Sequence, residues 1–137
     1  MFLGEHNHAL DAKGRLILPV KFRDQLQEGA FVTSETDGCL GLWPPADFER
    51  RALEMKERSK GGPEDRNVAR FFFAGAQDAS PDRQGRVALP PHLRKFAGLE
   101  RDVVVNGAWD HIEIWDAVVW QEKKLEGERA LAGNGVG

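Results

Sequence analysis

The chain has 137 residues with 41% hydrophobic side chains and a net charge of −3, enough for one core but not for two independently stable domains. No apolar run approaches the roughly 20 residues that span a bilayer, which excludes an integral membrane protein. The overall charge does not attract nucleic acid, so any such binding depends on local basic clusters.

The first residues and the cysteine content indicate the compartment. The N-terminal sequence has no basic stretch followed by an apolar one, so no secretory signal is expected. The single cysteine, Cys39, can form no internal disulfide and suits a reducing environment. We therefore expect a cytoplasmic protein.

The sequence contains one internal repeat. Residues 10–23 (LDAKGRLILPVKFR) and residues 81–94 (PDRQGRVALPPHLR) share Asp, Gly, Arg, Leu, Pro and Arg at one fixed offset. The likeness continues to residues 40–43 and 112–115, with one residue inserted in between. Two copies are too few for a solenoid, which needs at least about three. The repeat favours a pseudo-twofold pair of lobes that close one barrel-like core.

Each copy opens with a turn of pattern Asp-x-x-Gly-Arg, at residues 11–15 and 82–86. Glycine can adopt positive φ in such a turn, and the aspartate can accept hydrogen bonds from backbone amides. We expect Asp11 and Asp82 to stiffen these turns and to orient the arginine that follows four residues later.

Short strands and a short helix are predicted after each turn. Residues 16–18 and 87–89 have the apolar character of buried strands. In the helices that follow, the side chains expected to face the core are those of Phe22, Leu26, Leu93, Phe96 and Ala97. Two further strands complete each copy and end at Trp43 and Trp115, which we expect in the core.

Helices are also predicted between the copies and at the C-terminal end. Residues 46–60 carry an apolar stripe, and residues 64–73 end in three successive phenylalanines, more than one stripe can bury. The surplus phenylalanines belong either to the core or to a contact with another subunit. Asp116 can cap a helix that begins after it, and residues 130–137 are small, Gly-rich and expected to be disordered.

The basic residues gather on the repeated motif. Residues 11–23 and 82–101 each carry a net charge of +3, whereas residues 110–129 carry −3. Glycine lets a backbone approach closely, and arginine offers a planar fork for phosphate or guanine. A turn of this kind suits nucleic acid, and the alternative is an ordinary solvated turn.

Enzymatic alternatives find less support. Two related aspartates could share a proton as in an aspartic protease, but the Asp-Ser/Thr-Gly turn is absent and nearby cations would keep Asp11 and Asp82 ionised. His6 and His8 share a strand face but lack a third metal ligand at suitable spacing. No nucleotide-binding or serine-nucleophile pattern is present. We therefore predict no enzyme activity, catalytic residue, metal site or cofactor.

At these motifs the sequence resembles the MraZ family of bacterial regulators, a two-copy relative of the AbrB-type swapped-hairpin DNA-binding fold. The resemblance covers residues 1 to about 125 and rests on residues 10–16, 19–23, 71–73, 82–87, 90–94 and 113–115 and on the Met-Phe-x-Gly start. It implies an α+β, β-rich fold in which two AbrB-like repeats form a pseudo-twofold double-psi-type β-barrel. The implied units are repeat 1 (5–47), a helical linker (48–75), repeat 2 (76–119) and a C-terminal helix with a disordered tail (120–137).

The same resemblance implies a function. Family members regulate transcription at the head of the division and cell-wall gene cluster, bind short direct repeats upstream of their own gene and assemble into rings. The implied DNA-binding residues are Lys13, Gly14, Arg15, Arg83, Gly85 and Arg86. Because the second copy has Gln84 where the first has Lys13, we do not expect the two copies to contribute equally to DNA binding. We expect a nucleoid-associated homo-oligomer with DNA as its partner, no membrane partner and no small-molecule substrate.

Two other function classes stay open. AbrB-like folds also occur in antitoxins, and residues 71–73 could contact a partner protein, although an antitoxin would normally carry a longer partner-binding tail. A helix-turn-helix regulator is less favoured, because neither helix between the copies leads into a clear recognition helix. The DNA-binding and protein-binding hypotheses differ in whether arginine substitutions weaken DNA binding and its salt dependence.

Overall fold

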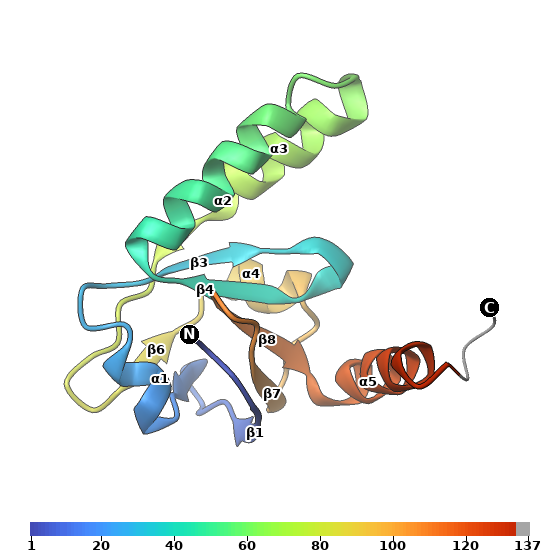
Figure 1. The fold of residues 1–137 in the computed structure, drawn as a ribbon. Coiled ribbons are helices and arrows are strands. Elements are labelled where there is room, and N and C mark those ends of the chain that lie inside the picture. Colours follow the sequence, from blue (N-terminus) through green and yellow to red (C-terminus); the bar gives the residue numbers. More distant parts are fainter. Residues whose placement is uncertain (134–137) are drawn as a thin grey trace.

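The computed structural model describes residues 1–133, which fold into an antiparallel sheet, a two-stranded ribbon and several helices (Figure 1). The strands are β1 (Glu5–Ala9), β2 (Arg15–Ile17), β3 (Phe31–Ser34), β4 (Leu40–Trp43), β5 (Gln77–Asp78), β6 (Arg86–Ala88), β7 (Asp102–Gly107) and β8 (Ile112–Asp116). The helices are α1 (Val20–Asp24), η1 (Thr36–Gly38), α2 (Pro45–Arg58), α3 (Pro63–Gly75), α4 (Pro91–Phe96) and α5 (Ala117–Leu131). The expected α+β class is confirmed.

The large sheet interleaves the two copies of the repeat. Its strand order is β1-β7-β8-β4-β3-β5, with every neighbouring pair antiparallel. Strand β1 of the first copy pairs with β7 of the second, and β4 pairs with β8. The short strands β2 and β6, one from each copy, form the separate ribbon. Neither copy therefore has a sheet of its own, and both contribute to one core.

The main core lies between the sheet and the layer formed by the ribbon, α1 and α4. Alternate side chains of the sheet strands enter it, as the two-residue period of a strand requires. From the opposite layer come Leu16, Leu18, Phe22, Val87, Leu89 and Leu93, each no more than 3% exposed. Full burial of such a side chain stabilises a fold by about 1.5–3 kcal/mol, so these few residues hold the ribbon against the sheet.

Three sequence predictions about this core need correction. The ribbon strands are buried on one face only, because Ile17 is 57% exposed and Ala88 is also exposed. The helical spacing predicts that Phe96 and Ala97 both face inward, but Phe96 is 38% exposed and only Ala97 is buried in the main cluster. Trp43 and Trp115 are buried, as predicted, but they lie outside the main cluster. They alternate with the core residues of β4 and β8 and so occupy the other face of the sheet.

Helices α2 and α3 form a hairpin that extends from the sheet (Figure 1). A small second cluster of Met55, Ala69 and Phe72, flanked by Phe48 and Val68, holds the two helices together. Phe72 is therefore the buried member of the three phenylalanines, whereas Phe71 and Phe73 are 55% and 44% exposed.

Helix α5 begins as the sequence predicts. The side chain of Asp116 accepts hydrogen bonds from the backbone N–H groups of Val118 and Val119. The disorder predicted from residue 130 is wrong at its start, because the helix continues to Leu131. The rest of that prediction concerns residues 134–137, which lie outside the described residues. No helix in the described part of the chain is long and apolar enough to cross a membrane.

Candidate nucleic-acid interface

The first turn closes around the carboxylate of Asp11. Its Oδ1 accepts hydrogen bonds from the backbone N–H groups of Lys13 and Arg15, at 2.9 and 2.8 Å. Its Oδ2 accepts one from Nε of Arg15 at 2.7 Å. The N–H of Gly14 donates to the Asp11 carbonyl at 3.0 Å, which completes an Asx-type turn. One side chain therefore fixes both the turn and one edge of the Arg15 guanidinium.

The second turn repeats this geometry. Oδ1 of Asp82 accepts from the N–H groups of Gln84 and Arg86, both at 2.9 Å, and Oδ2 accepts from Nε of Arg86 at 2.7 Å. Gly85 donates to the Asp82 carbonyl at 2.9 Å. Because the bond involving residue 84 uses only its backbone, the change from Lys13 to Gln84 leaves the turn unaltered and changes only the exposed charge.

The hydrogen bonds keep both aspartates ionised. The backbone N–H of Arg15 has the largest effect on the pKa of Asp11 and lowers it, aided by the Arg15 side chain and the Lys13 amide. Arg86 lowers the pKa of Asp82 in the same way. Each aspartate binds its own arginine, and so the geometry gives no support to a carboxylate pair that shares a proton.

An arginine from each copy lies over the glycine of the other copy's turn. A Cβ atom on Gly14 would lie 2.5 Å from Cζ of Arg94, and one on Gly85 would lie 2.8 Å from Cδ of Arg23. Both glycines are buried and have positive φ, 73° and 79°. Nη2 of Arg23 also donates to the Arg83 carbonyl at 2.6 Å. Sequence reasoning missed this role of Arg23 and Arg94, although both recur at the repeat offset.

The ribbon brings the two turns together. The backbone N–H of Leu18 donates to the Gly85 carbonyl at 3.0 Å, and the N–H of Leu89 donates to the Gly14 carbonyl at 3.1 Å. At the centre of the ribbon, Leu16 pairs with Val87, and both are fully buried. Because side chains alternate along a strand, the outer face of the ribbon carries Arg15, Ile17, Arg86 and Ala88.

The outer edges of both guanidinium groups are available to a ligand. Asp11 and Asp82 occupy the Nε atoms, but within residues 1–133 no hydrogen bond reaches the terminal nitrogens of Arg15 or Arg86. The two terminal nitrogens of a guanidinium match two phosphate oxygens, or O6 and N7 of guanine. A two-stranded β-ribbon also fits the major groove of DNA. The outer face of the ribbon can therefore bind nucleic acid, with the exposed Lys13 and Arg83 at its turns.

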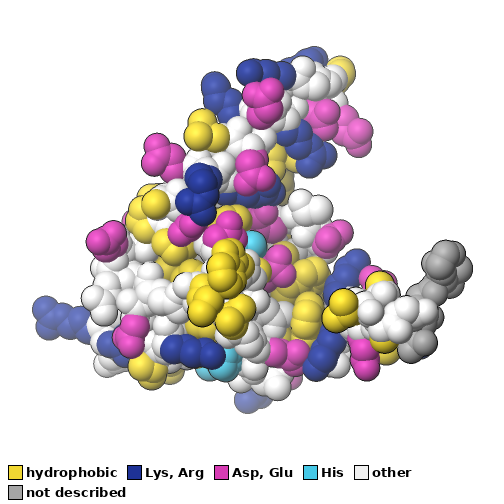
Figure 2. Space-filling view, viewed as in Figure 1, with side chains coloured by type: hydrophobic (Ala, Val, Ile, Leu, Met, Phe, Trp, Pro, Cys, Tyr) yellow, Lys and Arg dark blue, Asp and Glu magenta, His cyan; other side chains and the backbone are white. Residues whose placement is uncertain are grey.

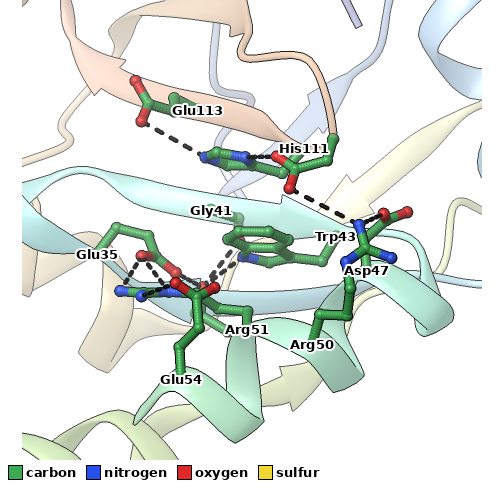
Figure 3. A network of polar contacts seen from close by, with 11 residues as sticks. Glu35, Gly41, Trp43, Asp47, Arg50, Arg51, Glu54, His111 and Glu113 are labelled. Carbon is green, nitrogen blue, oxygen red and sulfur yellow. Dashed lines mark hydrogen bonds and ion pairs between the residues drawn. The ribbon is translucent and has the colours of Figure 1, made fainter. Parts of the chain in front are cut away.

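A second polar cluster, which sequence reasoning did not predict, lies on the other face of the sheet (Figure 3). The His111 ring stacks on the Trp43 indole, with centroids 4.0 Å apart and an interplanar angle of 6°. Nδ1 of His111 lies 2.8 Å from Asp110, and Nε2 lies 3.5 Å from Glu113. The only sequence signal was the acidic pair that flanks this histidine by one and two residues.

Hydrogen bonds and an ion pair connect helix α2 to the same cluster. Nε1 of Trp43 donates to Oγ1 of Thr33 at 3.0 Å, and that hydroxyl donates to Glu35 at 2.6 Å. Glu35 is the ion-pair partner of Arg51 on α2, at 2.8 Å. Burial lowers the pKa of His111, but hydrogen bonds to Glu113 and Asp110 outweigh that effect and raise it. These contacts join β3, β4, β8 and α2, and we read them as structural.

Other reactive side chains form no site in the described residues. The rings of His6 and His8 are 6.4 Å apart, and the His6 ring packs edge-on against Phe22. Burial raises the pKa of the Cys39 thiol, which disfavours a reactive thiolate. No group of three or more His, Cys, Asp or Glu residues with metal-binding geometry occurs between residues 1 and 133.

Known proteins are similar to this chain over almost its whole length. The family model described as "MraZ protein, putative antitoxin-like" matches residues 1–71 and 72–130. A "Transcriptional regulator MraZ" of Salinispora arenicola is 47% identical over 132 residues, covering 96% of this chain and 93% of the relative. Proteins of the same name from Kineococcus radiotolerans and Cutibacterium acnes are 47% and 42% identical, covering 96% of this chain and 92% and 93% of their own lengths.

Proposed function

The chain belongs to the MraZ family, and from this membership we propose that it is a DNA-binding transcriptional regulator. The observation that carries the proposal is the β2–β6 ribbon, where Arg15 and Arg86 point outward with their terminal nitrogens free within the described residues. Lys13 and Arg83 would add phosphate contacts at the turns. Gly14 and Gly85 would act through the backbone shape, since both are buried under arginines.

The proposed target is a set of short direct repeats upstream of the protein's own gene, at the head of the division and cell-wall gene cluster. One ribbon offers few phosphate contacts, and the protein as a whole is acidic. Several linked subunits on successive repeats would raise affinity through effective concentration. A ring of subunits meets this requirement, and the spacing of the DNA repeats would then follow the spacing of the ribbons.

The fold would serve this function through its two related halves. We propose that residues 5–47 and 76–119 are AbrB-like swapped-hairpin repeats of a double-psi-type barrel, with residues 48–75 as a helical linker. Residues from 120 onward, which include most of α5, would form the C-terminal unit. The interleaved strand order supports this division, because β1 and β7 come from different halves. The proposal assigns the protein no catalytic role and places it in the cytoplasm, on the nucleoid.

Titration of labelled DNA by fluorescence anisotropy tests the proposal. The probes are a duplex from upstream of the protein's own gene and a shuffled duplex, each at low and physiological salt. We expect the native duplex to bind more tightly, and Arg15→Ala and Arg86→Ala to remove that preference. Lys60→Ala is the matched control, because it removes one positive charge from the α2–α3 hairpin. Equal binding of both duplexes, or unchanged binding by the arginine variants, would contradict the proposal.

The salt dependence separates two kinds of contact. If Arg15 contacts phosphate, its removal should weaken both duplexes alike and reduce the slope of log K against log salt by about 1. If Arg15 contacts a base instead, its removal should weaken binding of the native duplex only, by about 1–3 kcal/mol for a bidentate pair.

A protein-binding function is the second candidate, and two observations favour it. The family description includes the term antitoxin-like, and Phe71 and Phe73 are exposed on α3. It would gain support if neither duplex bound and if Phe71→Ser, but not Arg15→Ala, abolished a protein interaction.

A further inference from the structure

Helix α5 makes few contacts with the rest of its own chain. None of its 15 residues is buried, and Figure 1 shows it extending away from the sheet. The contacts that hold it come from one side, where the Trp120 ring lies 5.8 Å from Trp115 and Lys124 pairs with Glu5 at 3.1 Å. A lone helix of this length is marginal in water, so an additional partner would stabilise it.

The outer side of α5 combines apolar and acidic residues. Val118 and Leu125 are seven residues apart and are 71% and 45% exposed. Glu122 follows Val118 by four residues, and Glu128 follows Leu125 by three. These spacings place the two glutamates and the two apolar residues on one helical face. Within residues 1–133 neither glutamate has an ion-pair partner. We call this face the α5 stripe.

The α2–α3 hairpin carries a groove of the opposite character. Its apolar lining is Ala69, Phe73 and Ala74, and its cationic lining is Lys56, Arg66 and Arg70. Phe73 is 44% exposed. Arg66 and Arg70 donate to the Gly61 carbonyl and to Asn67 rather than to a carboxylate. Figure 2 shows Lys and Arg side chains along this hairpin. We call this surface the hairpin groove.

We propose that the α5 stripe of one copy packs into the hairpin groove of a neighbouring copy. Leu125 would pack beside Ala69, which lies between the two arginines, with Glu122 facing Arg70 and Glu128 facing Arg66. The lengths match, because 15 residues of α5 and 14 of α2 give about 22 and 21 Å at about 1.5 Å per residue. The two glutamates and the two arginines carry opposite charges. In the described part of the chain none of these four side chains forms an ion pair.

The contact joins two chains rather than two parts of one. Figure 1 shows the hairpin and α5 extending from the sheet in different directions. A contact between two different surfaces is heterologous, and it generates a closed ring or an open filament. The inference rests on the assembly proposed above and identifies the surfaces that build it.

Charge reversal tests the contact in the full chain, with mass measured by multi-angle light scattering. We expect Glu122→Lys with Glu128→Lys to reduce the mass toward that of the monomer, and Arg66→Glu with Arg70→Glu to do the same. A chain with all four changes should recover the assembly, because the charges are exchanged. The control is Glu49→Lys with Glu100→Lys, which changes the net charge equally at exposed positions outside both surfaces. Near-ultraviolet circular dichroism checks that each variant is folded.

Disulfide trapping gives an independent measurement. Arg70→Cys and Glu122→Cys are prepared as separate proteins and then mixed under mild oxidation. We expect covalent dimers in the mixture and not in either protein alone. The native Cys39 is buried, with a thiol pKa raised by burial, so it does not compete. Equal cross-linking in the mixture and in the separate proteins would overturn the contact.

The outcomes separate this inference from the proposed function. If the wild-type chain is monomeric, both the assembly and the contact are wrong. If it is oligomeric and neither charge reversal changes its mass, the contact is wrong and the assembly stands. If the contact is right, monomeric variants should bind a single DNA repeat as the wild type does and lose the gain in affinity on a duplex with several repeats.

Discussion

Arg23 of the first copy lies across Gly85 of the second, and its guanidinium donates to the carbonyl of the neighbouring Arg83 at 2.6 Å. Arg94 lies across Gly14 in the same manner, while its Nε donates to the Leu89 carbonyl at 2.9 Å. Each turn is thus held by an aspartate of its own copy and covered by an arginine of the other. The two turns are coupled through the fold.

This coupling predicts that an arginine substitution acts on the distant motif. Arg23→Ala should loosen the turn at residues 82–86 rather than the turn at 11–15 of its own copy. The loss of one hydrogen bond is worth about 1 kcal/mol, or roughly fivefold faster amide exchange in that turn. Hydrogen exchange measured by NMR checks this.

The mirror substitution serves as the internal control. Arg94→Ala removes the side chain that covers Gly14, so faster exchange should move to residues 11–15. If each variant instead loosened the turn of its own copy, the crossed arrangement would be wrong.

The glycine positions give a second prediction, on stability and binding together. Gly14→Ala forces an L side chain into positive φ, which costs about 1–2 kcal/mol, and also displaces Arg94. Gly98→Ala has the same strain, with φ of 65°, but its added Cβ meets nothing within 4 Å. Both variants should lose stability in urea titrations, and Gly14→Ala should lose more because it also displaces Arg94. DNA affinity should fall several-fold for Gly14→Ala alone. Equal DNA affinity of the two variants would show that the shape of the turn is unimportant.

The repeated motif could be predicted from the sequence because it is local. An Asp-x-x-Gly-Arg turn depends on residues four positions apart, and the expected hydrogen bonds of Asp11 and Asp82 to backbone amides are present. The cap of α5 by Asp116 is equally local. In such cases one side chain and the backbone next to it decide the geometry.

Features that join distant segments could not be predicted. The packing of Arg94 on Gly14 and the stacking of His111 on Trp43 depend on how β2 meets β6 and how β4 meets β8. The apolar neighbours of Ile17 predict a buried residue, but the ribbon has one buried face and Ile17 lies on the other. An apolar run of three residues cannot reveal which face is buried.

The aspartates give a third prediction, in which two physical effects have opposite signs. Asp11→Asn removes a negative charge from a basic surface, so electrostatics alone would strengthen DNA binding. The substitution also removes the ionic acceptor that holds Nε of Arg15. We expect the second effect to dominate for the native duplex, with affinity several-fold lower in anisotropy titrations. Asp24→Asn is the control, since it removes an exposed charge in the same copy and should not weaken binding.

The fourth prediction concerns the pH dependence of stability through His111. Burial alone would lower its pKa, but Glu113 and Asp110 raise it above the ordinary value of about 6.5. Because the folded state binds the proton more tightly than the unfolded state, this stabilisation is complete below the unfolded pKa. It is lost as pH rises through the folded pKa. The contribution of His111 to the free energy of unfolding should therefore decrease between about pH 6 and the weakly alkaline range.

His111→Phe isolates this contribution, because a phenyl ring can still stack on Trp43 but carries no titrating proton. Urea titrations across the same pH range should show a flatter curve for the variant than for the wild type. His92→Phe is the matched control, since His92 bonds only to the Gly75 carbonyl and contacts no carboxylate in the described residues. That variant should keep the wild-type slope. If His111→Phe kept the wild-type slope, the ion pairs of His111 with Glu113 and Asp110 would contribute little to the pH dependence.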